Sequence, residues 1–165
     1  MATGEEWTDH PAGCEIVGEF VRTLNDGVWS SDEARTEHCL PLALLDDASA
    51  APEWRDRFAL RTIREVLPIA LRTIGLDNHA AACESASDLA AARDAASRAR
   101  DAAMMIDPTQ AVVDAACNAS MRHQNAAVYA VYHAAQALFY KGKSDHVLAL
   151  GCRILAECHA GKSDR

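Results

Sequence analysis

The chain has 165 residues, of which 50% are apolar and 24% charged, and its formal net charge is −8. This length suits one domain with a core of its own, and nothing in the composition requires two. Residues 1–51 carry eleven acidic and two basic side chains, a net charge of −9. That charge argues against a nucleic-acid partner, because phosphate binding needs the opposite sign, and it favours a protein partner with a basic surface.

No run of about eighteen apolar residues occurs, and Met1–Asp9 is acidic with no apolar segment after it. We therefore expect no secretory signal, no membrane span and a cytoplasmic location. Residues 1–10 are expected to be frayed and residues 11–165 to form a single helical domain. The six cysteines are scattered through helical sequence, so we expect them to be reduced and mostly buried, with disulfides or a metal as the alternative. They are Cys14, Cys39, Cys83, Cys117, Cys152 and Cys158.

The first predicted helix spans about 13–24 and ends at an Asn-Asp-Gly turn. Ser30 and Glu33 have the spacing of a capping box, which predicts a second helix from about Ser31. Pro41 interrupts that helix, and three leucines continue its apolar face. They are Leu42, Leu44 and Leu45.

A third helix is predicted from Pro52, because proline suits the first helical position, and Pro68 should kink it by removing a backbone hydrogen bond. Gly75, followed by an apolar residue, predicts where this helix ends. Asp77 is then expected to cap a short fourth segment, and Ser87 to cap the alanine-rich helix that follows.

Alanine dominates the stretch from Ala80 to Ala137. Within it, mostly small side chains recur at alternating steps of three and four residues, which is the spacing of one helix face. The positions are Leu89, Ala92, Ala96, Ala99, Ala103 and Ile106. Such a face lets a neighbouring helix come close, so we expect a tightly packed pair of alanine-rich helices.

Residues 107–110, Asp-Pro-Thr-Gln, combine a capping aspartate with a proline at the first helical position, and they predict a new helix. The helical pattern continues to about Lys141 with a break near 118–125, Gly142 ends it, and Ser144 is expected to cap a last helix. No alternating strand pattern bounded by turns occurs. The predicted fold class is all-α, a single-domain bundle of six to eight antiparallel helices.

Histidine and cysteine are numerous, but their spacing matches no metal-binding motif. His79 and Cys83 lie four residues apart, which suits two ligands of a zinc site that needs four. The chain has no Cys-x-x-Cys, no Glu-x-x-His, no glycine-rich phosphate loop and no nucleophile elbow. We therefore predict no catalytic residue, no metal and no cofactor, and we lean towards a protein that is not an enzyme.

Arg57, Arg61 and Arg64 form a stripe on the third predicted helix. Glu53 precedes Arg57 by four residues and Glu65 follows Arg61 by four, which is the spacing of ion pairs on a helix surface. We interpret the stripe as a solvated face.

A set of aromatic and polar residues shares one side of a later helix whose other side is alanine. Its members are Tyr129, Tyr132, His133, Gln136 and Tyr140. Side chains of this kind combine an apolar body with a polar tip, which suits a contact surface and equally suits the boundary of a core. Both interpretations stay open on the sequence alone.

Two parts of the chain carry a resemblance to a known family. The first is the segment 20–45, with Leu-Asn-Asp at 24–26, Ser-Asp-Glu-Ala-Arg-Thr at 31–36 and Leu-Pro-Leu at 40–42; the second is the alanine-rich helix after Leu76. Together they resemble a group of alanine-rich, all-helical actinobacterial immunity proteins. The resemblance implies an all-helical fold and the binding of a cognate toxin, and it transfers no catalytic residue.

The sequence hypothesis is a non-enzymatic protein that binds a basic partner, such as a nuclease toxin, through acidic residues of its first third and through the later tyrosine face. The candidate residues are Glu15, Glu19, Asp26, Asp32, Glu33, Glu37, Tyr129, Tyr132, His133 and Tyr140. One alternative is a helical enzyme or ligand-binding bundle whose pocket is lined by Trp54, His79, Tyr132 or His133. Another is a structural homo-oligomer, a homodimer for example, that pairs its small-residue faces.

Overall fold

The structure, a computed structural model, describes residues 15–45, 50–106, 110–123 and 125–161. Every regular element in that part of the chain is helical, so the predicted all-α class is confirmed. The α-helices are α1 (Glu15–Asn25), α2 (Asp32–Cys39), α3 (Trp54–Arg61), α4 (Leu67–Arg72), α5 (Asp77–Glu84), α6 (Leu89–Ile106), α7 (Gln110–Ser120), α8 (Ala126–Leu138) and α9 (Ser144–His159).

Three short elements join or extend these helices. Leu40–Leu44 (η1) and Phe139–Lys141 (η4) are 3-10 turns, and Thr62–Val66 (η3) is a stretch of π-helix. Because α3, η3 and α4 follow one another without a gap, they form one continuous helix over 54–72 with a π-helical stretch in its middle. Counted this way, the described part of the chain holds eight helices, within the predicted six to eight.

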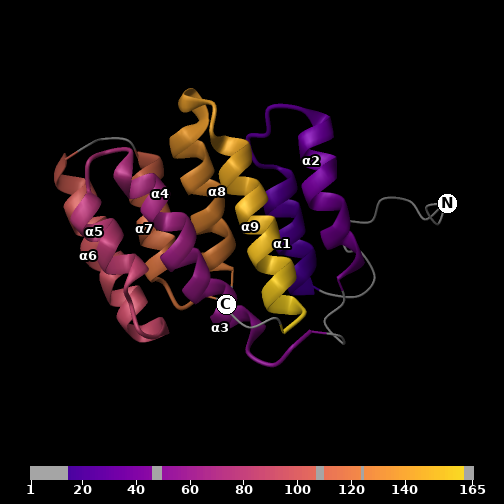
Figure 1. Ribbon diagram of the computed structural model, residues 1–165, viewed down its shortest axis with the longest axis horizontal. Coiled ribbons are helices and arrows are strands. Elements are labelled where there is room, and N and C mark those ends of the chain that lie inside the picture. Colours follow the sequence, from indigo (N-terminus) through magenta and orange to yellow (C-terminus); the bar gives the residue numbers. More distant parts are fainter. Residues whose placement is uncertain (1–14, 46–49, 107–109, 124, 162–165) are drawn as a thin grey trace.

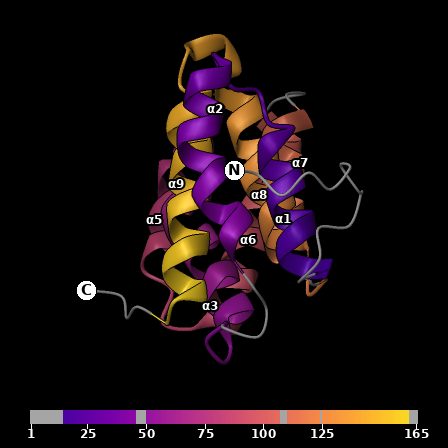
Figure 2. The same cartoon turned by 90° about the vertical axis from the view of Figure 1, so that its right-hand side faces the viewer.

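The helices follow one another across the molecule, from α5 and α6 at one end, through α7, α8 and α9, to α1 and α2 at the other (Figure 1). Helix α8 packs against α7, α9, α4 and α1, so it lies inside the bundle. Turned by a quarter, the molecule shows α2 in front of α9 and beside α1 (Figure 2). Helices α1 and α2 therefore lie together at one end of the molecule.

Alanine lines the contacts between α6, α7 and α8. Ala92, Ala96, Ala99 and Ala103 of α6 are at most 1% exposed, and α6 packs closely against α7. The predicted small-residue face is confirmed at these four positions, whereas Ile106 at the helix end is 57% exposed. Because the alanines are already buried within the chain, they are not available to pair two subunits, as the homo-oligomer alternative requires.

Large side chains fill the core at the other end of the bundle. Phe20 of α1 packs edge-on against Trp54, with ring centroids 5.6 Å apart, and lies 5.4 Å from the ring of Phe58. All three residues are at most 5% exposed. Burying an aromatic side chain of this size stabilises a fold by about 1.5–3 kcal/mol, so this cluster fixes α1 against α3.

Two helices are capped by the neighbour of the predicted residue. The hydroxyl of Ser31 accepts the N–H of Ala34 at 3.2 Å and caps α2, while Ser30 donates from its N–H and its hydroxyl to Asp145 of α9. Likewise Asp88 caps α6, its carboxylate accepting the N–H of Ala91 at 2.9 Å. Ser30 and Ser87 are therefore not the caps that we predicted.

Other predicted helix starts are also displaced. Helix α3 begins at Trp54 rather than Pro52, after Glu53 in the left-handed region (φ 60°). Asp77 and Ser144 are the first residues of α5 and α9, and neither caps its helix with its side chain. Residues 1–10 and the predicted boundary at 107–109 lie outside the described residues.

The glycine signal at the end of the third helix is confirmed, and at the proline, where we predicted a kink, the structure has a π-helical stretch. The π-helical stretch η3 lies directly before Pro68, where the missing N–H disturbs the regular hydrogen bonding. Gly75 is left-handed (φ 77°), and the N–H of Leu76 donates to the carbonyl of Leu71 at 3.1 Å, which closes the helix as predicted.

Five of the six cysteines lie in the described residues, and all five are free thiols. Cys39, Cys83, Cys152 and Cys158 are buried and Cys117 is half-buried, as the sequence predicts; Cys14 lies outside the described part. Cys39 of α2 and Cys152 of α9 influence each other: the interaction with Cys152 lowers the pKa of Cys39, and the interaction with Cys39 together with burial raises the pKa of Cys152. Among the described residues, no helix is both long and apolar enough to cross a bilayer.

Candidate functional site

The predicted acidic residues occupy α1, α2 and the turn between them. Asp26, Asp32, Glu33 and Glu37 are exposed, and Glu19 is half-buried. Glu15 is the first residue of α1, and its side chain lies outside the described part of the structure. Arg35 pairs with Asp32 at 2.7 Å, an exposed pair that neutralises part of the surface. We call Asp26, Asp32, Glu33 and Glu37 the acidic surface.

Several contacts anchor α2 and the turn that joins it to α1. The indole N–H of Trp29 donates to the carbonyl of Leu24 at 2.8 Å, and its ring stacks on His38 with centroids 5.8 Å apart. The N–H of Ser30 donates to Asp145 at 2.7 Å, which ties the turn to α9. Because both ends of α2 are anchored in this way, the carboxylates keep fixed positions relative to one another.

Two of the carboxylates share one side of α2 with an exposed leucine. Glu33 and Glu37 are four residues apart on α2 and Leu40 follows three residues later, which places these three side chains on one side, while Leu44 is exposed at the end of the 3-10 turn η1. Leu40 is 63% and Leu44 85% exposed, which makes the prediction of Leu44 on a buried apolar face wrong. Only Leu42 of this 3-10 turn enters the core, because the tighter turn changes the direction of its neighbours.

The acidic helix and the tyrosine helix meet at one hydrogen bond. The hydroxyl of Tyr129 donates to the Oε1 atom of Glu19 at 3.1 Å, across the contact between α1 and α8. Burial and the neighbouring Glu19 carboxylate raise the pKa of Tyr129. The structure thus brings Glu19 and Tyr129, two of the candidate residues, into direct contact.

The other residues of the tyrosine face are exposed to different degrees. Tyr132 and His133 are half-buried and their rings meet edge-on at 5.3 Å, while the Nδ1 atom of His133 lies 3.0 Å from the amide oxygen of Gln136. Tyr140 lies beyond α8 in η4 and is 96% exposed. Tyr129, Tyr132 and His133 therefore sit at the boundary of the core, and Tyr140 is fully in solvent.

The predicted arginine stripe is mostly engaged in tertiary contacts. Arg61 pairs with Glu65 at 2.5 Å, as predicted, and also with Glu157 of α9 at 2.7 Å; its side chain is only 11% exposed. These two carboxylates raise the pKa of Arg61. Arg57 donates to the carbonyl of Cys158 at 2.9 Å, which leaves the proposed pair with Glu53 unformed. A solvated face is therefore the wrong description, since the stripe fastens α3 to α9.

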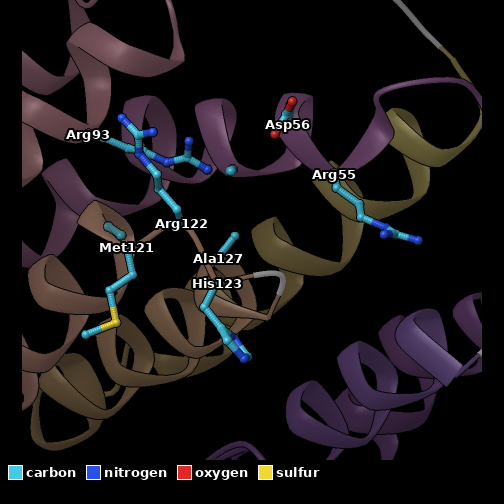
Figure 3. A pocket seen from close by; sticks show the side chains of 9 residues that line it. Arg55, Asp56, Arg93, Met121, Arg122, His123 and Ala127 are labelled. Atoms are coloured by element: carbon cyan, nitrogen blue, oxygen red, sulfur yellow. The ribbon is translucent and has the colours of Figure 1, made fainter.

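A cavity of about 210 Å³ lies where α3, α6 and the connection from α7 to α8 meet (Figure 3). Its lining includes Arg55, Asp56, Arg93, Arg122 and His123. None of the residues proposed for a ligand pocket from the sequence lines it. Trp54, for example, is 5% exposed and packs in the aromatic core, with His159 at 5.9 Å.

Metal-binding residues do not gather in the part of the chain that the structure describes. There, no group of three or more histidine, cysteine, aspartate or glutamate side chains lies close enough to hold an ion. Cys83 is fully buried in α5, and burial raises the pKa of its thiol to about 11, so it stays protonated and is a poor nucleophile near neutral pH.

No family model, no curated protein and no solved structure matches this chain. A functional assignment therefore depends on the geometry of its own surfaces. Two of them stand out, the acidic surface with its two exposed leucines and the cavity lined by arginines.

Proposed function

We propose that this protein is a non-enzymatic, protein-binding protein of the immunity type, which neutralises a basic toxin, such as a nuclease, through its acidic surface. The observation that carries the proposal is the row of Glu33, Glu37 and Leu40 along one exposed side of α2, with the exposed Leu44 following in η1. It offers both kinds of contact that a protein interface uses, charged groups and apolar side chains.

The charges of this surface have few partners within the molecule. Of its four carboxylates, Asp32 has an ion pair, with Arg35, and no ion pair joins Asp26, Glu33 or Glu37 to another described residue. Glu33 remains ionised, because hydrogen bonds from its own backbone N–H and from Ser31 lower its pKa. Carboxylates of this kind attract a basic protein from a distance and pair with lysine or arginine on contact.

The two exposed leucines add apolar contact area to the charged surface. Exposed ion pairs contribute about 0–1 kcal/mol each, so a charged row alone binds weakly. A partner that covers Leu40 and Leu44 removes most of their exposed apolar area from water, which contributes roughly 1.5–3 kcal/mol for each fully buried side chain. The two contributions together suit a specific contact that also depends on salt.

A toxin that acts on nucleic acid fits this surface because it must itself carry a basic face to bind phosphate. The resemblance of segments 20–45 and of the alanine-rich helix to immunity proteins supports the same type of partner. The acidic surface lies within the first of these segments.

Comparative capture of partners tests the proposal. The bait protein carries Asp26→Asn, Glu33→Gln and Glu37→Gln, and its matched control carries Asp77→Asn, Asp94→Asn and Asp101→Asn, three exposed acids far from α2 in sequence. Both variants change the net charge by the same amount. We expect the wild type and the control to retain the same basic protein from an extract of the native host and the acidic-surface variant to lose it. Equal recovery by all three proteins would contradict the proposal.

A second pair of variants separates the leucines from the charges. Leu40→Ser and Leu44→Ser should weaken capture of that same protein without changing the net charge, and both residues are exposed enough for the fold to tolerate the change. Undiminished capture would limit the interface to its carboxylates.

A further inference from the structure

The cavity between α3, α6 and the α7–α8 connection has an unusual charge for this protein. Its lining holds three arginines and one carboxylate, although the whole chain carries −8. None of its elements belongs to the acidic surface. It is therefore a separate feature, and what it binds does not depend on the proposed function.

Two of the arginines converge at the cavity. Figure 3 shows the side chain of Arg93, from α6, and that of Arg122, from the α7–α8 connection, extending to the same place above α3. Arg55 extends away from them and lies over the ring of Trp54, with its guanidinium carbon 5.6 Å from the ring centroid. Arg93 and Arg122 are therefore the two cations that a ligand in the cavity would meet.

Neither of these two arginines has a carboxylate partner among the described residues. Asp56, at the rim of the cavity, pairs with neither of them. The Nε atom of Arg93 is buried, and no described residue hydrogen-bonds to it. A ligand in the cavity cannot reach this buried atom, so it would have to bond the outer nitrogens of the guanidinium group.

The nearby helix α8 adds to the attraction for an anion. Ala127, in its first turn, lines the cavity, so the positive end of a helix of 13 residues faces the same space. His123 does not take part, because its Nδ1 atom accepts the N–H of Asn125 at 3.3 Å and its ring points away.

We infer that this cavity binds a phosphate group, with Arg93 and Arg122 as its ligands. The two guanidinium groups approach from different elements, and a phosphate group has enough oxygens and negative charge to bond both of them, which favours it over a carboxylate. A volume of about 210 Å³ corresponds to roughly seven water molecules in the liquid. This admits inorganic phosphate or a small phosphorylated compound.

Calorimetric titration of the full chain with inorganic phosphate, at constant ionic strength set by sodium chloride, tests the inference. We expect the wild type to bind at millimolar concentrations or below. Arg122→Gln should weaken binding about 10- to 100-fold, the effect of losing one charge-assisted hydrogen bond. The matched control Arg153→Gln, at an exposed position of α9 outside the cavity, should bind as the wild type does.

Arg93→Gln is a second variant with the same expected loss, and Arg122→Gln remains informative if Arg93→Gln fails to fold, because Arg122 is exposed. Acetate at equal concentration should not displace phosphate. The inference is overturned if the wild type shows no binding, if Arg122→Gln binds phosphate as tightly as the wild type, or if acetate competes equally. A small phosphomonoester that binds more tightly than inorganic phosphate would identify the natural ligand as a phosphorylated compound.

Discussion

Helices α8 and α9 approach each other closely where Gly151 of α9 meets Val131 of α8. A Cβ atom added at Gly151 would lie 2.5 Å from the Cγ1 atom of Val131 and 3.3 Å from its Cγ2 atom, well inside normal contact. Val131 is fully buried and β-branched, so it has little freedom to rotate away. Gly151→Ala therefore forces the two helices apart.

Two opposing effects determine how much Gly151→Ala changes the free energy of unfolding. Overpacking a core in this way costs about 1–3 kcal/mol, while alanine is favoured over glycine inside a helix by about 1 kcal/mol. For a contact as short as this one, we expect the first effect to dominate and Gly151→Ala to lower the free energy of unfolding by about 1–2 kcal/mol. In the background of Val131→Ala the clash is absent, and the same substitution should raise the free energy of unfolding by about 1 kcal/mol.

Urea unfolding followed by circular dichroism measures all four proteins of this double-mutant cycle. The expected result is a change of sign between the two backgrounds, with an interaction energy of about 2–3 kcal/mol and an unchanged dependence on urea concentration. If Gly151→Ala changes stability equally in both backgrounds, the close packing of α8 on α9 is refuted.

Three further predictions concern the alanine contact, one helix cap and one thiol. Ala96→Leu should lower the free energy of unfolding by about 1–3 kcal/mol, because the site is fully buried between helices; a stability equal to that of the wild type in urea would contradict this. The hydrogen bond from the N–H of Ala91 lowers the pKa of Asp88. The ionised cap therefore stabilises the fold fully above the ordinary aspartate pKa of about 4, and this stabilisation is lost as the pH falls through the lower pKa that Asp88 has in the folded protein. Asp88→Asn keeps the acceptor without the charge, so thermal melts from neutral to acidic pH should show a smaller loss of Tm than in the wild type, and parallel curves would argue against the cap. Burial raises the pKa of Cys83 to about 11, so mass spectrometry should find it unalkylated by iodoacetamide in the folded protein at mildly alkaline pH and alkylated in urea; modification at equal rates would disprove its burial.

The helices themselves could be predicted from the sequence because their signals are local. Periodicity of apolar residues, the glycine at position 75 and the proline at position 68 act within one or two turns, and the structure ends the helix at that glycine and has a π-helical stretch before that proline. The cap of α2 could not be chosen in this way. Ser30 and Ser31 both fit the local pattern, and the choice depends on Asp145, a residue 115 positions away that binds Ser30.

The candidate sites also differ in whether local sequence or a contact between distant residues determines them. The exposure of the acidic residues follows from their charge, whereas the exposure of Leu40 and Leu44 depends on how η1 turns against the core. The arginine cavity needs three elements to meet, which no local pattern describes. One sequence signal does exist, because neither Arg93 nor Arg122 has an acidic residue three or four positions away to pair with on a helix.

Hydrogen exchange of the protein in complex with its captured basic partner tests the central proposal most directly, because it locates the interface without substitutions. The account predicts that added protection falls on α2 and η1, residues 32–44, and on the turn that follows α1. Protection confined to α5, α6 or α7, with exchange over residues 32–44 unchanged, would contradict the assignment of the acidic surface as the binding site.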